Sequence, residues 1–297
     1  MKGTFYRGLI YLSKRLGIWF FIVMAWNIAS GYFFFSPKKL RNSIVFYRAL
    51  FPSRSLLYHL WCTWNQYHNF IYIYLDRWLL QNYDVIHYTQ EGWHYIEEVA
   101  RKRTGGLILM SHLGNWEIGA YLMSRHSNNN AGIKLLLYLG MKPYEKIERI
   151  QKEDLKQSGI KIIATEENTS SPFDILEGIQ FARSGGFVSM AGDRLLSMDQ
   201  RTVAVQFLGH EVFLPETPFV FALLSQVPIL IFFANRFGKG KYHFVAYPPK
   251  HVLATSHKDK QAVINKAAQE YANILEEMAR RHPYEWFHFE PFIRRAI

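Results

Sequence analysis

The chain has 297 residues, of which 49% are hydrophobic, and this apolar content is enough for a sizeable packed core. Its single cysteine, Cys62, excludes an intramolecular disulfide framework and a cysteine-based zinc site, and is compatible with a reducing compartment. A net charge of +11 would suit a nucleic-acid binder, but nine basic residues precede the first acidic one, Asp76, and the remainder is nearly balanced. This distribution argues against nucleic acid as a partner and indicates a polybasic N-terminal region.

Residues 17–36 form an apolar run between two groups of basic residues. At about 1.5 Å per residue, a helix of this length could cross a hydrocarbon core of about 30 Å. It could equally lie in the interface with its basic flanks on anionic head groups, because Lys and Arg on both sides give no orientation. A cleaved signal peptide is the alternative, since Ala29-Ser30-Gly31 resembles a cleavage site. We expect a membrane anchor helix within residues 1–40 and one domain over residues 41–297.

Beyond Asp76, short apolar runs alternate with amphipathic stretches, which is typical of an α/β domain. We expect a single αβα-type domain with a central mixed sheet and no further domain boundary. The expected strands are 106–111, 133–139, 160–164, 186–191, 203–208, 227–234 and 242–247. The expected helices are 56–75, which would lie partly at the membrane interface, and 115–126, 143–159, 171–185 and 258–282. Ser171 suits a helix start, and Gly159 and Gly185 suit helix ends.

The stretch "SHLGNWEIG" (111–119) places His112 and Glu117 directly after an expected strand. Five positions on one helix correspond to a turn of about 140°, so the two side chains can meet only if a helix begins between them. Gly114 permits an unusual backbone angle and Asn115 is a good N-cap, which favours such a start. Glu117 would then accept from one ring nitrogen and leave the other as a general base for a hydroxyl. A surface loop is the plainer alternative.

Other catalytic and cofactor-binding motifs are missing from the sequence. It contains no His-Glu-x-x-His zinc spacing, no Gly-x-Ser-x-Gly elbow and no Walker or dinucleotide glycine loop. We therefore expect no metal, nucleotide or redox cofactor.

The segment "HLGNWE" after an apolar strand resembles the motif of histidine, four residues and an acidic residue found in glycerolipid-type acyltransferases. Its Gly-Asn-Trp-Glu form is similar to that of the bacterial lipid A late acyltransferases. The resemblance extends over nearly the whole chain, through "AGDR" (191–194), "FLGHEVFLPETPF" (207–219), "VPILIFF" (227–233) and "HPYEWFHFEPF" (282–292). It departs where Phe287 to Phe292 precede Arg294 and Arg295, which indicates a divergent branch and leaves the acceptor open.

The resemblance implies direct transfer of a fatty acyl chain from acyl carrier protein to a hydroxyl of a glycolipid such as a lipid A precursor. This transfer would occur at the cytoplasmic face of the bacterial inner membrane. His112, supported by Glu117, would be the base, and the backbone N–H groups of Gly114 and Asn115 would stabilise the oxyanion. Alternatives are the same chemistry on a lysophospholipid, a phosphoinositide mannoside, an amino-acid lipid or an aryl polyene lipid, or a catalytically silent lipid-binding protein.

Three further residues are candidate substrate-binding residues. Arg194 would bind a phosphate or carboxylate of the acceptor through its planar guanidinium, and Asp193 would orient the Arg194 side chain. A structural salt bridge of Arg194 with Asp193 or with a neighbouring residue is the alternative. Gly209, with Pro215, would shape a loop beside the site, although a plain turn explains both equally well.

Overall fold

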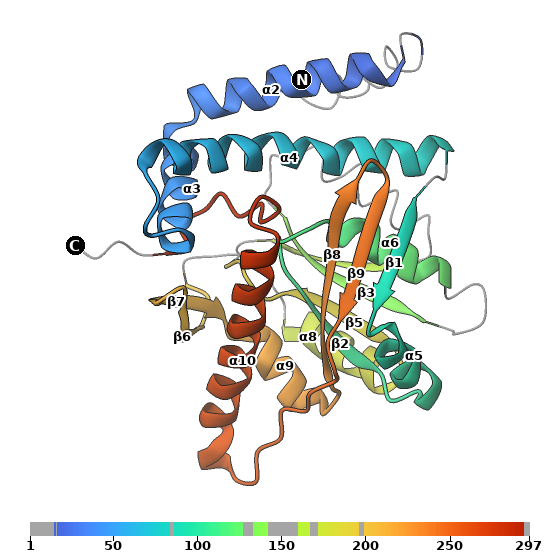
Figure 1. Cartoon of the computed structure of the whole chain (residues 1–297). Coiled ribbons are helices and arrows are strands. Elements are labelled where there is room, and N and C mark those ends of the chain that lie inside the picture. The colour runs from blue at the N-terminus through green and yellow to red at the C-terminus, as the bar shows by residue number, and fades with distance from the viewer. Residues whose placement is uncertain are drawn as a thin grey trace.

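The computed structural model describes residues 15, 17–83, 86–126, 133–141, 160–166, 172–195 and 199–293. A seven-stranded sheet in the order β1-β9-β8-β2-β5-β3-β4 forms its centre (Figure 1). Neighbouring strands are parallel except β8 and β9, which are antiparallel, so the sheet is mixed as expected. The strands are β1 (His87–Glu91), β2 (Gly106–Met110), β3 (Leu135–Met141), β4 (Lys161–Glu166), β5 (Phe187–Ala191), β8 (Ile229–Gly238) and β9 (Lys241–Ala246).

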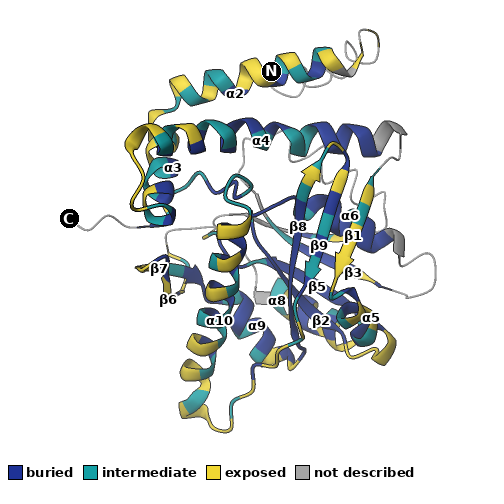
Figure 2. Cartoon of the chain, viewed as in Figure 1, coloured by how far each residue is buried: buried dark blue, intermediate teal, exposed yellow. Residues whose placement is uncertain are grey.

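Helices cover both faces of this sheet because its central strands are apolar on both sides. Alternate residues of β2 enter different clusters: Leu107 and Leu109 face one cluster, Ile108 and Met110 the other. The first cluster packs against α8 (Pro172–Arg183), α9 (Thr217–Ser225) and α10 (Lys260–Arg281). The second packs against α5 (Trp93–Lys102) and α6 (Trp116–His126). The result is the expected αβα arrangement, with the buried strands inside (Figure 2).

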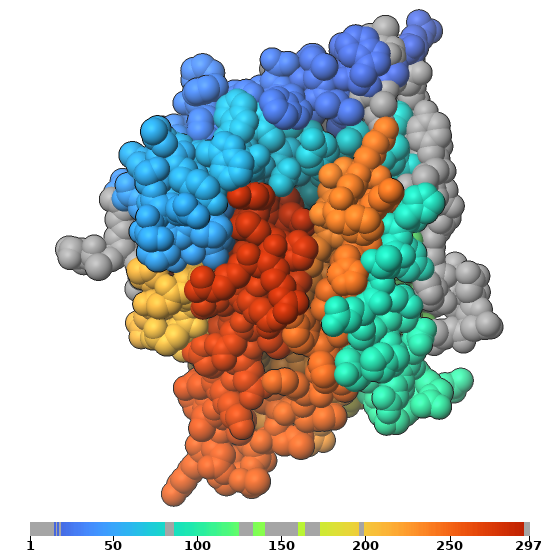
Figure 3. Space-filling view, viewed as in Figure 1, coloured from blue at the N-terminus to red at the C-terminus, as the bar shows by residue number. Residues whose placement is uncertain are grey.

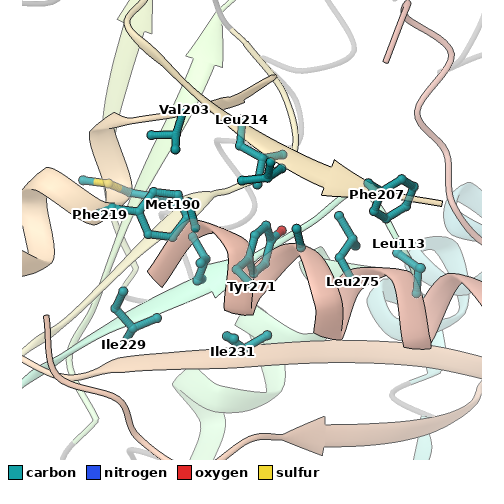
Figure 4. Packing of buried hydrophobic residues seen from close by; sticks show 14 of the residues in the cluster. Leu113, Met190, Val203, Phe207, Leu214, Phe219, Ile229, Ile231, Tyr271 and Leu275 are labelled. Atoms are coloured by element: carbon teal, nitrogen blue, oxygen red, sulfur yellow. The ribbon is translucent and has the colours of Figure 1, made fainter. Parts of the chain in front are cut away.

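A separate hairpin, β6 (Thr202–Phe207) and β7 (His210–Pro215), lies against α10. Val203 and Phe207 are buried on its inner face, and Tyr271 and Leu275 of α10 pack beside them (Figure 4). Because alternate residues of β6 are exposed, the hairpin has one apolar face only.

Among the described residues, α2 (Ile18–Phe35), α3 (Pro37–Leu50) and α4 (Leu56–Tyr83) precede the sheet. Helices α2 and α4 run side by side across one end of the molecule (Figures 1 and 3). Among the described residues, no single helix is long and apolar enough to cross a bilayer. Helices α2 and α3, bent by 88° where they meet, satisfy that test as a pair by length and composition.

Every expected strand is present, with ends shifted by a few residues at most. The expected helices 115–126, 171–185 and 258–282 are α6, α8 and α10, and 56–75 extends to Tyr83 as α4. Gly185 has the positive φ, 93°, expected after the end of a helix. The expected helix 143–159, with Gly159, and also Ser171, Arg294 and Arg295, lie outside the described residues. The sequence reasoning missed β1, β7, α3, α5 and α9.

Candidate active site

His112 and Asp193 come together because two neighbouring strands end at the same level. Strands β2 and β5 are parallel, with Met110 in register with Ala191. Each of the two polar residues stands two positions beyond its strand, so continuing the register places one next to the other. Both therefore lie at the carboxyl edge of the sheet, where open α/β sheets commonly hold their sites.

The Asp193 carboxylate is buried and accepts three hydrogen bonds. Its Oδ1 is 2.8 Å from Nδ1 of His112, and its Oδ2 accepts from the His112 backbone N–H at 2.8 Å and from Nε1–H of Trp286 at 2.9 Å. Burial raises the pKa of Asp193, but the imidazoles of His112 and His288 and the indole of Trp286 outweigh it and hold that pKa well below its usual range. Asp193 is thus an ionised acceptor that fixes the His112 ring.

The other nitrogen of His112, Nε2, is the one left for a substrate. The His112 side chain is 22% exposed, whereas the Asp193 side chain is fully buried. With a carboxylate on Nδ1, the neutral ring carries its proton there and its lone pair on Nε2. This arrangement can accept a proton at Nε2 and stabilise the imidazolium that forms.

The expectation that Glu117 supports His112 is wrong in this structure. Glu117 pairs instead with Arg77 of α4, and both side chains are buried, at 11% and 6% exposure. Helix α6 does begin after Asn115, whose Oδ1 accepts from the Ile118 N–H at 3.4 Å, as the sequence predicted. The first turn of α6 nevertheless directs Glu117 to α4, while His112 turns to Asp193.

The expected oxyanion donors are also wrong, because both backbone groups already have partners. The N–H of Gly114 donates to the Glu285 carbonyl at 2.9 Å, and that of Asn115 donates to the Ala234 carbonyl at 2.8 Å. Gly114 has a positive φ of 79°, and a Cβ there would lie 2.3 Å from the Ala234 oxygen. The glycine therefore allows the loop to approach β8 closely.

The family model of the bacterial lipid A biosynthesis acyltransferases matches residues 69–295, a range that contains His112, Asp193 and Trp286. The chain belongs to this family. A comparison with curated proteins finds no match. Membership confirms the resemblance read from the sequence and implies an acyltransferase. The match begins within α4, so α2 and α3 lie outside it.

In this acyltransferase, Arg194 follows Asp193 directly but is not oriented by it. The two Asp193 oxygens are occupied by His112 and Trp286, and no ion pair of Arg194 is found in the described part of the chain. Among the residues that the structure describes, the buried Nε of Arg194 has no hydrogen-bond partner. Both the proposed orienting role of Asp193 and a salt bridge between the two residues are therefore wrong, and the described residues leave the Nε of Arg194 unpaired.

Gly209 occupies the exposed turn of the β6–β7 hairpin, with a φ of 76°. No atom lies within 4 Å of a Cβ built there, so the backbone angle explains the glycine. Pro215 ends β7. The hairpin reaches the neighbourhood of the site through Phe207, whose ring centre is 5.3 Å from that of Trp286.

The C-terminal segment 285–288 supplies site residues that the sequence reasoning missed. The Phe287 N–H donates to the His112 carbonyl at 2.8 Å, and Leu113 forms an isolated β-bridge with Trp286. Gln66 of α4 donates to the Trp286 carbonyl at 2.5 Å. In the sequence this segment resembles the C-terminal motif of the family. Its Trp and His are the residue types that could have indicated a contact with the site.

A cavity of about 200 Å³ lies beside the loop that contains Gly114 and Asn115, between α4 and β8. Gly114, Asn115 and Phe287 line it together with Arg236, whose guanidinium carbon is 4.2 Å from the centre of the Tyr72 ring. The Nε of Arg236 donates to the buried Asp76 carboxylate at 2.6 Å, and the Tyr242 hydroxyl donates to the same oxygen at 2.7 Å. These bonds fasten α4 to the sheet at the edge of the site.

Proposed function

We propose that the protein is a membrane-associated O-acyltransferase that transfers a fatty acyl chain from an acyl carrier protein thioester to a hydroxyl of a glycolipid such as a lipid A precursor. The observation that carries this proposal is the contact between His112 Nδ1 and the buried Asp193 carboxylate at 2.8 Å. A histidine held in this way can act as a general base that deprotonates an alcohol. Family membership indicates that the reaction is an acyl transfer.

In the proposed reaction, Nε2 of His112 takes the proton of the acceptor hydroxyl as its oxygen attacks the thioester carbonyl. The tetrahedral intermediate then collapses, the carbon–sulfur bond breaks, and the imidazolium returns the proton to the departing sulfur. No acyl-enzyme is required. General-base assistance is worth about 10² to 10⁴ in rate.

Arg194 is proposed to bind an anionic group of the acceptor. Its buried and unpartnered Nε supports this role, because leaving such a donor unpaired costs about 1–3 kcal/mol unless a ligand satisfies it. A guanidinium can bind a phosphate or carboxylate through two parallel hydrogen bonds. A phosphorylated glycolipid would provide that group.

The experiment that tests this function is a lipid profile of cells without the gene, complemented either with the wild-type chain or with His112→Ala. We expect one acylated lipid to be absent without the gene, restored by the wild type and not restored by His112→Ala. Matched protein levels in the membrane fraction are the control. Restoration of that lipid by His112→Ala would reject the catalytic base, and the identity of the lipid decides between a lipid A precursor and another acceptor.

Membrane association is proposed to occur through α2 lying in the plane of the interface. Phe21, Ala25 and Ala29 of α2 pack on Ile71 and Leu75 of α4, so the two helices are joined along their length. Helix α4 is in turn fastened to the catalytic domain by the ion pair of Asp76 with Arg236. A spanning orientation of α2 would carry α4, with its charged residues Asp76 and Arg77, into hydrocarbon, which is costly.

The surroundings of α2 suit a bilayer surface. Much of α2 is coloured as exposed (Figure 2). The large apolar residues exposed on α2 and at the start of α4 are Trp19, Val23, Trp26, Ile28, Tyr32, Phe34, Phe35, Leu56, Leu57 and Trp61. Basic residues are exposed on α3 and just after it: Lys38, Lys39, Arg41, Arg48 and Arg54. Aromatic residues beside basic ones favour the interface of an anionic membrane.

Probe depth along α2 tests this orientation. In a Cys62→Ser background, Val23→Cys and Phe34→Cys are labelled with a fluorophore and quenched by brominated lipids in anionic vesicles. The two labelled positions are eleven residues apart, which corresponds to about 16 Å along a helix. In a spanning helix the two labels therefore lie at different depths in the bilayer, whereas in a helix that lies in the interface they lie at the same depth. We expect the two labels on α2 to lie at equal depths. A label at Lys258→Cys, an exposed position, is the control and is expected not to be quenched. Unequal depths would contradict the proposal.

A further inference from the structure

Trp286 and His112 are the described residues that donate hydrogen bonds to the Asp193 carboxylate. The indole N–H of Trp286 and the backbone N–H of His112 both donate to Oδ2, at 2.9 and 2.8 Å. This leaves Oδ1 to Nδ1 of His112, at 2.8 Å. A carboxylate turns easily about the bond that joins it to Cβ. Two donors on Oδ2 therefore fix which oxygen faces the imidazole, and Trp286 supplies one of them.

The Trp286 ring is held by other aromatic rings. Its centre lies 4.9 Å from that of Phe46 on α3, 5.3 Å from that of Phe207 on β6 and 4.8 Å from that of Phe292. The residue is 2% exposed, so it is enclosed by protein and can influence a substrate only through other residues. A buried indole N–H requires an acceptor, and Asp193 provides it. The packing thus directs the N–H at the carboxylate.

The backbone on either side of Trp286 is bonded to α3 and α4. Side chains of these helices donate to backbone carbonyls within residues 283–289: Tyr47 to Pro283 at 2.9 Å, Asn69 to Tyr284 at 3.4 Å, Gln66 to Trp286 at 2.5 Å and Asn42 to Phe289 at 3.0 Å. The same segment bonds the loop of His112, through the N–H of Phe287 and the carbonyl of Glu285. Residues 283–289 therefore connect α3 and α4 to the loop that carries His112.

Gln66 makes the bond nearest to the indole. It is buried in α4, and its Oε1 has no hydrogen-bond partner among the residues that the structure describes. Leaving a buried acceptor unpaired costs stability, so the fold alone does not explain a glutamine at this position. The bond from its Nε2 to the Trp286 carbonyl gives Gln66 a second use, because it holds the residue that orients Asp193.

Resting on the acyl transfer proposed above, we propose that Trp286 is a positioning residue. Its indole N–H keeps the Asp193 carboxylate turned toward Nδ1 of His112, and Gln66 holds Trp286 in place from α4. Trp286 moves no proton and contacts no substrate. Because α4 also carries part of the exposed apolar surface, the proposed membrane-binding helices are connected to the catalytic histidine through residues 283–289.

The test compares Trp286→Phe with Trp286→His in the purified full-length enzyme. Both keep an aromatic ring, but phenylalanine has no donor, whereas histidine can carry an N–H on Nε2, as many bonds from Cα as the indole Nε1. Partners that orient metal-bound histidines are worth about 10- to 100-fold. We expect Trp286→Phe to lose kcat by about this factor with KM for the acyl donor unchanged, and Trp286→His to retain much more. Gln66→Leu is expected to lower kcat in the same way.

The NMR signal of the His112 Nδ1–H in ¹⁵N-histidine-labelled protein separates orientation from packing. We expect Trp286→Phe to lose the shift of a strong hydrogen bond, because the carboxylate can then turn away. Phe46→Leu, which changes the packing on the Trp286 ring and leaves its N–H, is the control. It is expected to keep this signal and to lose less turnover than Trp286→Phe.

Wild-type turnover in Trp286→Phe would overturn the role of Trp286. So would a loss of turnover in Trp286→Phe without any change in the Nδ1–H signal, since the loss would then come from packing. Failure of the proposed function is distinguishable, because the signal does not depend on the reaction. In that case the wild type transfers no acyl chain, while Trp286→Phe still changes the signal.

Discussion

Replacing Asp193 by asparagine is expected to reduce kcat by about 10⁴ while leaving the fold intact. The carboxylate accepts from Nδ1 of His112, from its backbone N–H and from the Trp286 indole, and an amide can accept at only one of its two positions. The asparagine N–H₂ group would face a donor, and His112 would lose the partner that holds its proton on Nδ1. Steady-state kinetics with an acyl carrier protein thioester measure the effect.

Glu117→Gln is the matched control for this prediction, since it neutralises the acidic residue that the sequence predicted as the partner of His112. Because Glu117 pairs with Arg77, its loss is expected to lower stability more than turnover per folded molecule. A fall in kcat for Glu117→Gln as large as that for Asp193→Asn, at equal folded fraction, would contradict the assignment.

The second large effect concerns the ion pair of Arg77 and Glu117. Arg77→Met removes the cation and leaves a buried carboxylate uncompensated, which is expected to lower the free energy of unfolding by about 3–5 kcal/mol. The loss of the Arg77 contact with the Tyr74 ring, at 5.4 Å, adds to the effect. A lower melting temperature of the detergent-solubilised chain measures it.

The double variant Arg77→Met with Glu117→Leu provides the internal control. Replacing both partners by apolar side chains removes the uncompensated charge, so the double variant is expected to be more stable than Arg77→Met alone. A double variant no more stable than the single one would show that the two side chains do not act as a pair.

The sheet was predictable because its central strands are buried on both faces and are read as continuous apolar runs. Strand β1, with the sequence "HYTQE", escaped prediction because it is a largely exposed edge strand, paired among the described strands with β9 alone. Helix α9, "TPFVFALLS", is short and apolar nearly all round, so it carries no helical periodicity. Elements of this kind are set by tertiary contacts.

The position of His112 was predictable because a strand end followed by a glycine and an N-cap can be recognised in the sequence. The partner of His112 could not be predicted in the same way. The register of β2 with β5 brings Asp193 next to His112, and register is a property of the folded sheet. The spacing of His112 and Glu117 favoured the wrong pairing, since Arg77 comes to Glu117 only once α4 has packed across the domain. The sequence indicates Asp193 as a site residue, but as one that orients Arg194.

The central claim is that Asp193, and not Glu117, holds the proton on Nδ1 of His112. The most direct test is the NMR signal of that Nδ1–H in ¹⁵N-histidine-labelled protein, compared among the wild type, Asp193→Asn and Glu117→Gln. We predict a strongly hydrogen-bonded signal in the wild type that persists in Glu117→Gln and disappears in Asp193→Asn. Persistence in Asp193→Asn together with loss in Glu117→Gln would contradict the claim.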